Sequence, residues 1–257
     1  RGTMRYVRWL LNLVPAPLTA DQLLAAAEAD LRAGAVEANP NRAQALALLS
    51  HLLARRSQTV DAKLTAMEAY EVDPYLSEAE DVLTRLFLTS LDLEDAAEAN
   101  KWCREGFRRF PRSPPFTECQ IQVYALKGQK ADVPKLWTLL EQNVAQYPPA
   151  EREYRRRRGE LFVAMALANA GLKDSAGAVA LRAREGAGAD VDPTRDLVYV
   201  EILFRSMAGD RDEAIRLLKL YLVTNPEDKV TIAQDSTWWW RNLRSDPEFR
   251  RLVGLAR

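Results

Sequence analysis

The sequence predicts an all-α protein, and three observations lead to this expectation. Apolar residues recur every three or four positions, as in Leu46, Leu49 and Leu53, which is the period of an amphipathic helix. Runs that alternate apolar and polar residues, the pattern of a half-buried strand, are missing. Proline and glycine fall between the periodic segments, where they mark turns, and the abundant alanine favours helix.

Composition excludes several classes of function. The chain has 257 residues, of which 36 are basic and 36 acidic, so its net charge of zero argues against a general nucleic-acid binder. One histidine, His51, and two cysteines leave too few ligands for most metal sites and for most His-based catalysis. We see no signal peptide and no run of 18 apolar residues, so no membrane insertion is expected within this chain. The opening Arg1-Gly2-Thr3 suggests a fragment or a processed product.

Turn residues divide the chain in order. Pro40, Pro74, Pro111 and Pro226 each follow the end of a periodic segment, because proline cannot continue a helix. Pro134 instead fits the first turn of a helix. Glycines 128, 171 and 209 are expected in the turns between paired helices, and small residues where paired helices touch: Ala62, Ala99, Ala176 and Ala214. We interpret residues 186–188 as a turn, since the flanks of a phosphate loop are missing.

The resulting segments form hairpins of similar length. They are a divergent first hairpin at 4–40, repeats at about 43–76, 80–112, 114–149, 157–190 and 195–228, and a cap at 229–257. This pattern resembles the tetratricopeptide repeat (TPR), a helix–turn–helix unit of about 34 residues. The fit is weaker at 80–112, where the bulky Phe87 stands at a place that the family usually gives to a small residue. The unit at 195–228 aligns only after a slip of one residue.

The resemblance implies a single domain over 1–257. Its fold would be a right-handed α-solenoid of about five to six helical hairpins with a C-terminal capping helix. One hairpin cannot bury its apolar face alone, so stacked neighbours share a continuous core. Ser245-Asp246-Pro247-Glu248 is expected to start the capping helix, and Phe249, Leu252 and Val253 to pack back on the last hairpin.

The tail carries a narrower resemblance. An array that ends in Trp and Leu243-Arg244-Ser245-Asp246-Pro247-Glu248-Phe249 resembles the C-terminal TPR region of bacterial signalling proteins. These include eukaryotic-like serine/threonine kinases, adenylate cyclases and transcriptional regulators. No kinase signature is present in this chain. The resemblance implies a sensory or regulatory segment of a longer protein.

In the TPR family the first helix of each unit lines a concave groove, and the resemblance places the partner-binding residues there. By place in the unit they are His51, Arg55, Thr84, Leu88, Glu118, Gln122, Arg158, Leu161, Met165, Tyr199 and Leu203. This mixture of apolar and polar side chains suits an extended peptide or a partner helix. Some family members clamp the C-terminal carboxylate of chaperones, but Ala47, His51 and Arg55 stand at those places and do not support that clamp.

The leading hypothesis is a non-catalytic scaffold module that binds a protein or peptide partner, with no enzyme activity, cofactor, metal or nucleic acid. One alternative is the sensory segment of a bacterial signalling enzyme or regulator whose catalytic or DNA-binding domain lies outside this chain. The other is a repeat protein that self-associates through the ends of its stack.

Cys103 and Cys119 flank a turn, on successive helices and at comparable depth. Two interpretations stay open: a structural disulfide, or two buried thiols that act as small apolar residues. A disulfide would favour an extracytoplasmic rather than a cytoplasmic location.

Two further clusters have a functional and a structural interpretation. Residues 155–158 are four consecutive arginines, which could bind an anion, but nearby Glu residues favour a solvated helix face with local ion pairs. Trp238, Trp239 and Trp240 could form a ligand platform. Because consecutive helical residues splay about 100° apart, at most two would pack inward together and the third would stay partly exposed.

Overall fold

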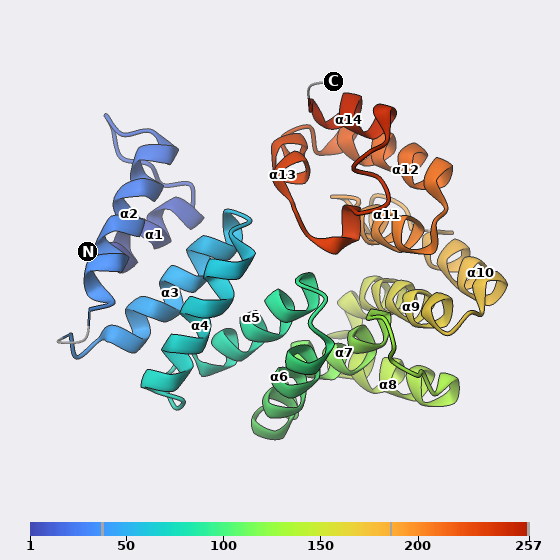
Figure 1. The fold of residues 1–257 in the computed structure, drawn as a ribbon, viewed down its shortest axis with the longest axis horizontal. Coiled ribbons are helices and arrows are strands. Elements are labelled where there is room, and N and C mark those ends of the chain that lie inside the picture. Colours follow the sequence, from blue (N-terminus) through green and yellow to red (C-terminus); the bar gives the residue numbers. More distant parts are fainter. Residues whose placement is uncertain (37–38, 186, 256–257) are drawn as a thin grey trace. The chain divides into compact units, whose positions relative to one another are not determined.

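The computed structural model describes residues 1–36, 39–185 and 187–255, and within these ranges every regular element is helical (Figure 1). The helix end expected before Pro40 and the turn expected at 186–188 fall partly on residues 37–38 and 186, outside the described residues. Whereas the sequence favours one domain, the chain forms two compact units, residues 1–90 and 91–257, and each is described by itself.

Unit 1 consists of paired helices. They are α1 (Gly2–Leu10), α2 (Ala20–Gly34), α3 (Arg42–Arg55), α4 (Thr59–Val72) and most of α5 (Ala79–Asp92). Helix α1 packs on α2 and α3 packs on α4, while α3 also contacts α1 and α2. Tyr6, Leu31 and Leu52 belong to the buried core that these helices share. A capping box at Thr19 and Gln22 fixes the start of α2.

Unit 2 contains the remaining helices. They are α6 (Ala96–Arg109), α7 (Pro114–Gln122), η1 (Val123–Ala125), α8 (Val133–Ala145), η2 (Pro149–Glu151), α9 (Arg152–Asn169), α10 (Lys173–Arg184), α11 (Asp196–Ala208), α12 (Arg211–Thr224), α13 (Asp228–Gln234), η3 (Trp238–Trp240) and α14 (Pro247–Val253). Helices α7 and α8, α9 and α10, and α11 and α12 pack in pairs, as Figure 1 shows for the last two. Each predicted repeat segment from 43–76 to 195–228 thus contains two helices.

Helix α9 is the centre of unit 2. It contacts α7, α8, α10 and α11, and every residue from Gly159 to Leu167 is buried. A Cβ atom on Gly159 would come within 2.2 Å of Leu140 Cδ1, so the absence of a side chain lets α9 approach α8 closely. Over this stretch the helix is buried on every side, and it positions the helices packed around it.

Local signals in the sequence agree with the observed turns and contacts. Gly128, Gly171 and Gly209 have φ angles of 82°, 83° and 79°, in the left-handed region that glycine adopts without strain. The four alanines expected at helix contacts are at most 1% exposed: Ala62, Ala99, Ala176 and Ala214. Asp246 caps α14 by accepting hydrogen bonds from the backbone N–H groups of Glu248 and Phe249, as predicted.

No helix in the described residues combines the length and the apolar character that crossing a membrane requires.

Candidate functional site

Three residues of the predicted groove lie in the core of unit 2. Leu161 and Met165 on α9 are 1% and 0% exposed, and Gln122 at the end of α7 is 5% exposed. Neighbouring helices cover these side chains in this structure, and their role as partner-binding residues stays a prediction. A sequence template assigns faces to a helix, but only the packed structure shows how many of these faces are covered.

Two polar residues of the predicted groove neutralise each other. Arg158 forms ion pairs with Glu118 on α7 and with Asp196 on α11, and its Nε atom lies 3.5 Å from Asp196 Oδ2. The hydroxyl of Tyr154 donates a hydrogen bond to the same Asp196 carboxylate. The nearby acidic groups raise the pKa of Arg158 in spite of its burial, so it stays charged. This network joins α7, α9 and α11 and leaves no unpaired charge for a ligand.

The tail of the chain covers another part of the predicted groove. The ring of Trp240 lies 6.0 Å from the ring of Tyr199, and the ring of Tyr221 lies 5.2 Å from Tyr199 on its own hairpin. Leu203, one turn further along α11, is half-buried. Tyr199 is half-buried and in contact with side chains of the same unit, and its role in partner binding stays a prediction.

The three consecutive tryptophans attach the tail to a segment far away in the sequence. Trp238 Nε1 donates a hydrogen bond of 2.8 Å to the carbonyl oxygen of Leu91, and Trp239 Nε1 donates one of 2.9 Å to Asp92 Oδ1. Both bonds span 147 residues. Trp239 and Trp240 are buried and Trp238 is half-buried, which agrees with the expectation that two of the three pack inward. The tail, residues 229–257, thus contacts the first residues of unit 2 and does not only cap its last hairpin.

Asp92, which accepts the hydrogen bond from Trp239, has a raised pKa, so we expect the stability of this contact to depend on pH. Burial and the neighbouring Asp235 raise the pKa of the Asp92 carboxyl group from 3.8 to about 6, and the hydrogen bond from Trp239 opposes this shift. The folded state thus binds this proton more tightly than the unfolded chain does. Binding of this proton therefore adds to the free energy of unfolding. The contribution is complete below pH 3.8 and is lost as the pH rises through about 6.

We expect Asp92→Asn to stabilise unit 2 at pH 7.5 by about 2 to 3 kcal/mol, because the amide keeps an acceptor for Trp239 without a buried charge. The gain should shrink toward zero as the pH falls to 4. Urea unfolding of the full chain at both pH values measures it, with the exposed Asp190→Asn as the control. An equal gain at both pH values would show that the charge of Asp92 is not its cause.

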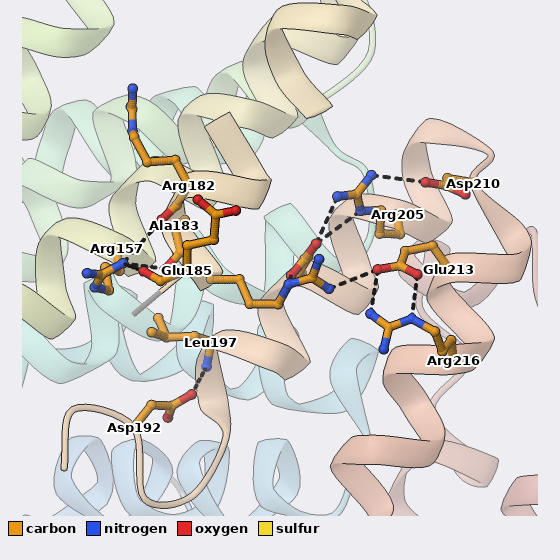
Figure 2. A network of polar contacts seen from close by, with 12 residues as sticks. Arg157, Arg182, Ala183, Glu185, Asp192, Leu197, Arg205, Asp210, Glu213 and Arg216 are labelled. Carbon is orange, nitrogen blue, oxygen red and sulfur yellow. Dashed lines mark hydrogen bonds and ion pairs between the residues drawn. The ribbon is translucent and has the colours of Figure 1, made fainter. Parts of the chain in front are cut away.

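The arginines of residues 155–158 are each paired with an acid. Arg155 pairs with Glu151, Arg156 with Glu141 and Arg157 with Glu153, in addition to the Arg158 pairs above. Arg157 also donates hydrogen bonds to the carbonyl groups of Arg182 and Ala183 at the end of α10 (Figure 2). The interpretation as an ion-paired helix face is confirmed, and these side chains do not form an anion site.

A second ionic network joins the last two hairpins. Glu201 on α11 is 1% exposed, and Arg205 donates to its Oε1 atom over 2.9 Å. Arg184 forms ion pairs with Glu201 and Glu213, and hydrogen bonds from Arg216 and Arg184 lower the pKa of Glu213 to about 2. Figure 2 shows the pair of Glu213 and Arg216. Burial raises the pKa of Glu201. Each acid faces an arginine, so the network stabilises the packing of α10, α11 and α12, although the buried Glu201 Oε2 atom accepts no hydrogen bond and lies 3.6 Å from Arg184 Nε.

Cys103 on α6 and Cys119 on α7 form a disulfide, and their Cα atoms are 5.8 Å apart. The helices meet closely at this point, because a Cβ on Gly106 would lie within 2.2 Å of two atoms of the Phe116 ring. Of the two open interpretations, the structure has the bonded one.

The predicted groove residues of unit 1 lie in a different environment. His51 is half-buried, while Arg55 and Leu88 are exposed and Thr84 is half-buried. The guanidinium carbon of Arg55 lies 5.9 Å from the centre of the Trp9 ring, in cation–π geometry. The ring of Tyr6 lies edge-on to His51 at 5.6 Å. Side chains from α1 and α3 thus meet around His51.

Arg85 completes this cluster, and sequence reasoning missed it. It lies on α5, one position after the predicted Thr84, and its charge acts on both Tyr6 and His51. Tyr6 was missed as well, because it belongs to the divergent first hairpin, where the repeat pattern is weakest. We name Tyr6, Trp9, His51, Arg55 and Arg85 the basic-aromatic cluster.

The basic-aromatic cluster contains polar atoms without partners. Tyr6 is 0% exposed, and its hydroxyl group and the Nε atom of Arg85 are buried without a hydrogen-bond partner. Within the described residues neither Arg55 nor Arg85 forms an ion pair; Asp81 on α5 acts on Arg85 only at longer range. Buried polar atoms are nearly always paired in proteins, so these two unpaired atoms are exceptions to the usual pairing.

The charge of the basic-aromatic cluster comes from its arginines. Burial, together with the positive charges of Arg85 and Arg55, lowers the pKa of His51 to about 4, so His51 is neutral at pH 7. Burial also lowers the pKa of Arg85, but arginine stays protonated. Arg55, the half-buried Arg85 and the indole of Trp9 surround the buried phenol of Tyr6, and guanidinium groups can bind a carboxylate by charge-assisted hydrogen bonds.

Comparison with known proteins finds neither a family model nor a curated protein that matches this chain. In the described part of the chain, no group of three or more His, Cys, Asp or Glu side chains is placed to hold a metal ion.

Proposed function

We propose that the chain is a non-catalytic binding module of TPR-like hairpins, and that unit 1 binds an acidic segment of a protein partner. The observation that carries this proposal is the pair of arginines, Arg55 and Arg85, without an acidic partner beside the unpaired hydroxyl group of Tyr6. The paired charges in unit 2 provide the contrast. There, the corresponding groove arginine, Arg158, is neutralised by Glu118 and Asp196.

An acidic peptide would supply what the basic-aromatic cluster lacks. A carboxylate can accept hydrogen bonds from both guanidinium groups at once, and the flat faces of Trp9 and His51 can contact the chain on either side of it. Such a ligand would also remove the repulsion that lowers the pKa of His51. Binding through this surface requires no nucleophile, metal or cofactor, which agrees with a scaffold.

We expect a fluorescent ten-residue peptide rich in Asp and Glu to bind the full chain at low salt. Arg55→Gln combined with Arg85→Met should weaken binding by about 100-fold, because each charge-assisted hydrogen bond contributes about 1.5 kcal/mol or more. Methionine keeps most of the volume of the half-buried Arg85. Fluorescence anisotropy measures the affinity.

The matched control is Arg8→Gln with Arg104→Gln, which removes the same charge from two exposed positions. If this control weakens binding as much as the cluster variant does, the peptide only responds to net charge and the proposal fails. It also fails if a peptide with Gln in place of every acid binds equally well.

A further inference from the structure

A second surface, in unit 2, has features of a ligand site and is independent of the role proposed for unit 1. It is a hollow of about 340 Å³ where four interhelical turns meet the tail. Its lining residues are Glu94, Ala125, Lys127, Ala168, Asn169, Lys173, Met207, Ala208, Trp238, Arg241 and Asn242. We name it the turn hollow. Its volume lies at the lower end of the range of about 300 to 1,000 Å³ for small-molecule sites.

Hydrogen bonds hold the walls of the turn hollow in place. Asn169 Nδ2 donates to the carbonyl oxygen of Leu126 over 2.6 Å, and Asn242 Nδ2 donates to that of Ser206 over 2.8 Å. The hydroxyl of Ser206 in turn donates to the carbonyl oxygen of Trp239 over 2.7 Å. These bonds fix the orientation of both amide side chains, so this part of the site is formed before a ligand arrives.

The charge of the turn hollow is positive. Arg241 pairs with Glu94, the one acid in the lining, over 2.5 Å. Lys127 and Lys173 have no ion pair with any described residue, although most basic side chains of unit 2 do. The ammonium groups of Lys127 and Lys173 are therefore two positive charges in the lining that no carboxylate neutralises, and they favour the binding of an anion.

The start of α10 adds to this preference. Lys173 is its first residue, and no side chain caps its first turn. The starts of α6 and α8, in contrast, are capped by the carboxylates of Asp95 and Asp132. Uncapped backbone N–H groups at a helix start attract negative charge. The lysines, the hollow and this free helix start point to the same ligand chemistry.

The other walls of the turn hollow are apolar and flat. Trp238 is half-buried, and its only polar hydrogen is donated to Leu91, so its ring can offer only an aromatic face. Met207 and three alanines complete this side. An unsaturated ring could stack there while its anionic group reaches the lysines.

We propose that the turn hollow binds a small organic anion, a carboxylate or a phosphate joined to a flat unsaturated group. The ligand would contact the tail at Trp238 and the turns at Lys127 and Lys173, and so it would hold the tail against them. Because its site is complete only when Trp238 lies beside the turns, it would stabilise the folded unit 2 by mass action. A small molecule would thus control the attachment of the tail.

The test uses phenyl phosphate and benzoate as probes, with inorganic phosphate and benzyl alcohol as the two halves of the ligand. Tryptophan fluorescence and thermal melting of the full chain report binding. We expect phenyl phosphate, benzoate or both to bind at least about tenfold more tightly than either half, and to raise the melting temperature. The better of the two probes identifies the anionic group.

Lys127→Gln with Lys173→Gln should weaken the binding of that probe by about tenfold or more, and so should Trp238→Leu. The control is Lys135→Gln with Lys229→Gln, two exposed lysines outside the lining, and should leave the affinity unchanged. The proposal is overturned if no probe binds, if phosphate alone binds as tightly as phenyl phosphate, or if the control variant loses as much affinity. Circular dichroism verifies that each variant is folded.

Discussion

Trp240→Ala is expected to lower the free energy of unfolding of unit 2 by about 3 to 5 kcal/mol. The side chain is 0% exposed, and its ring contacts Phe249 at 5.6 Å as well as Tyr199. Its Nε1 atom donates a hydrogen bond of 2.8 Å to Asp235 Oδ2, so the variant leaves both a cavity and a carboxylate without its donor. Urea unfolding followed by circular dichroism measures the loss.

The neighbouring Trp238→Ala is the matched control, since it removes the same atoms from a half-buried position. It should cost clearly less, because a partly exposed ring loses less apolar contact. Equal losses for the two variants would mean that Trp240 does not anchor the tail more than its neighbour does. Both variants should retain the helices of unit 1.

Loss of the disulfide is the second large effect. Cys103 and Cys119 are 16 residues apart in sequence, and a bond that closes a loop of this size contributes about 3 kcal/mol by restricting the unfolded chain. The Cys103→Ala, Cys119→Ala variant should therefore unfold at a lower urea concentration by a corresponding amount. Both sulfur atoms are buried, so alanine also tests whether the site tolerates the smaller side chains.

Wild-type protein that has been unfolded and refolded in reductant separates the two contributions. If the bond itself stabilises the fold, the reduced protein should lose most of what the alanine variant loses. A reduced protein as stable as the oxidised one would contradict the prediction. Alkylation followed by mass measurement counts the free thiols in each sample.

The two units differ in how many of their arginine and lysine side chains are paired with acids, and both proposals depend on basic side chains that are not paired. In the core of unit 2, Arg158, Arg184 and Arg205 each face carboxylates, so their role is structural. In unit 1, Arg55 and Arg85 lack such partners, and their positive charges add to the effect of burial in lowering the pKa of His51. A net charge of zero for the whole chain conceals this local excess, because the surplus acids lie elsewhere.

Much of the helical structure could be predicted from the sequence. The 3.6-residue period, the turn glycines at positions 128, 171 and 209 and the cap at Asp246 act over a few residues, and each is found where it was expected. The alanines expected at helix contacts, such as Ala62 and Ala214, are buried, and the local apolar period was enough to predict this. The two cysteines could be placed near each other because one turn separates their helices.

The candidate sites depend on contacts that no local pattern contains. Leu161 and Met165 fit a groove by their place in the repeat, yet α9 is enclosed by four neighbouring helices. Arg85 looks like an ordinary helical arginine until α1 brings Tyr6 beside it. Ion pairing likewise decided which arginines are free, and this depends on the neighbours of each helix.

The sequence by itself determined that this chain is helical, where its turns fall and which small residues the helices share, since hydrogen bonding and apolar period are properties of short segments. Only the tertiary structure decided that the tail docks 147 residues back on Leu91 and Asp92, and which charges remain unpaired. These outcomes depend on which surfaces exclude water from one another, and that is fixed by the packing of distant helices.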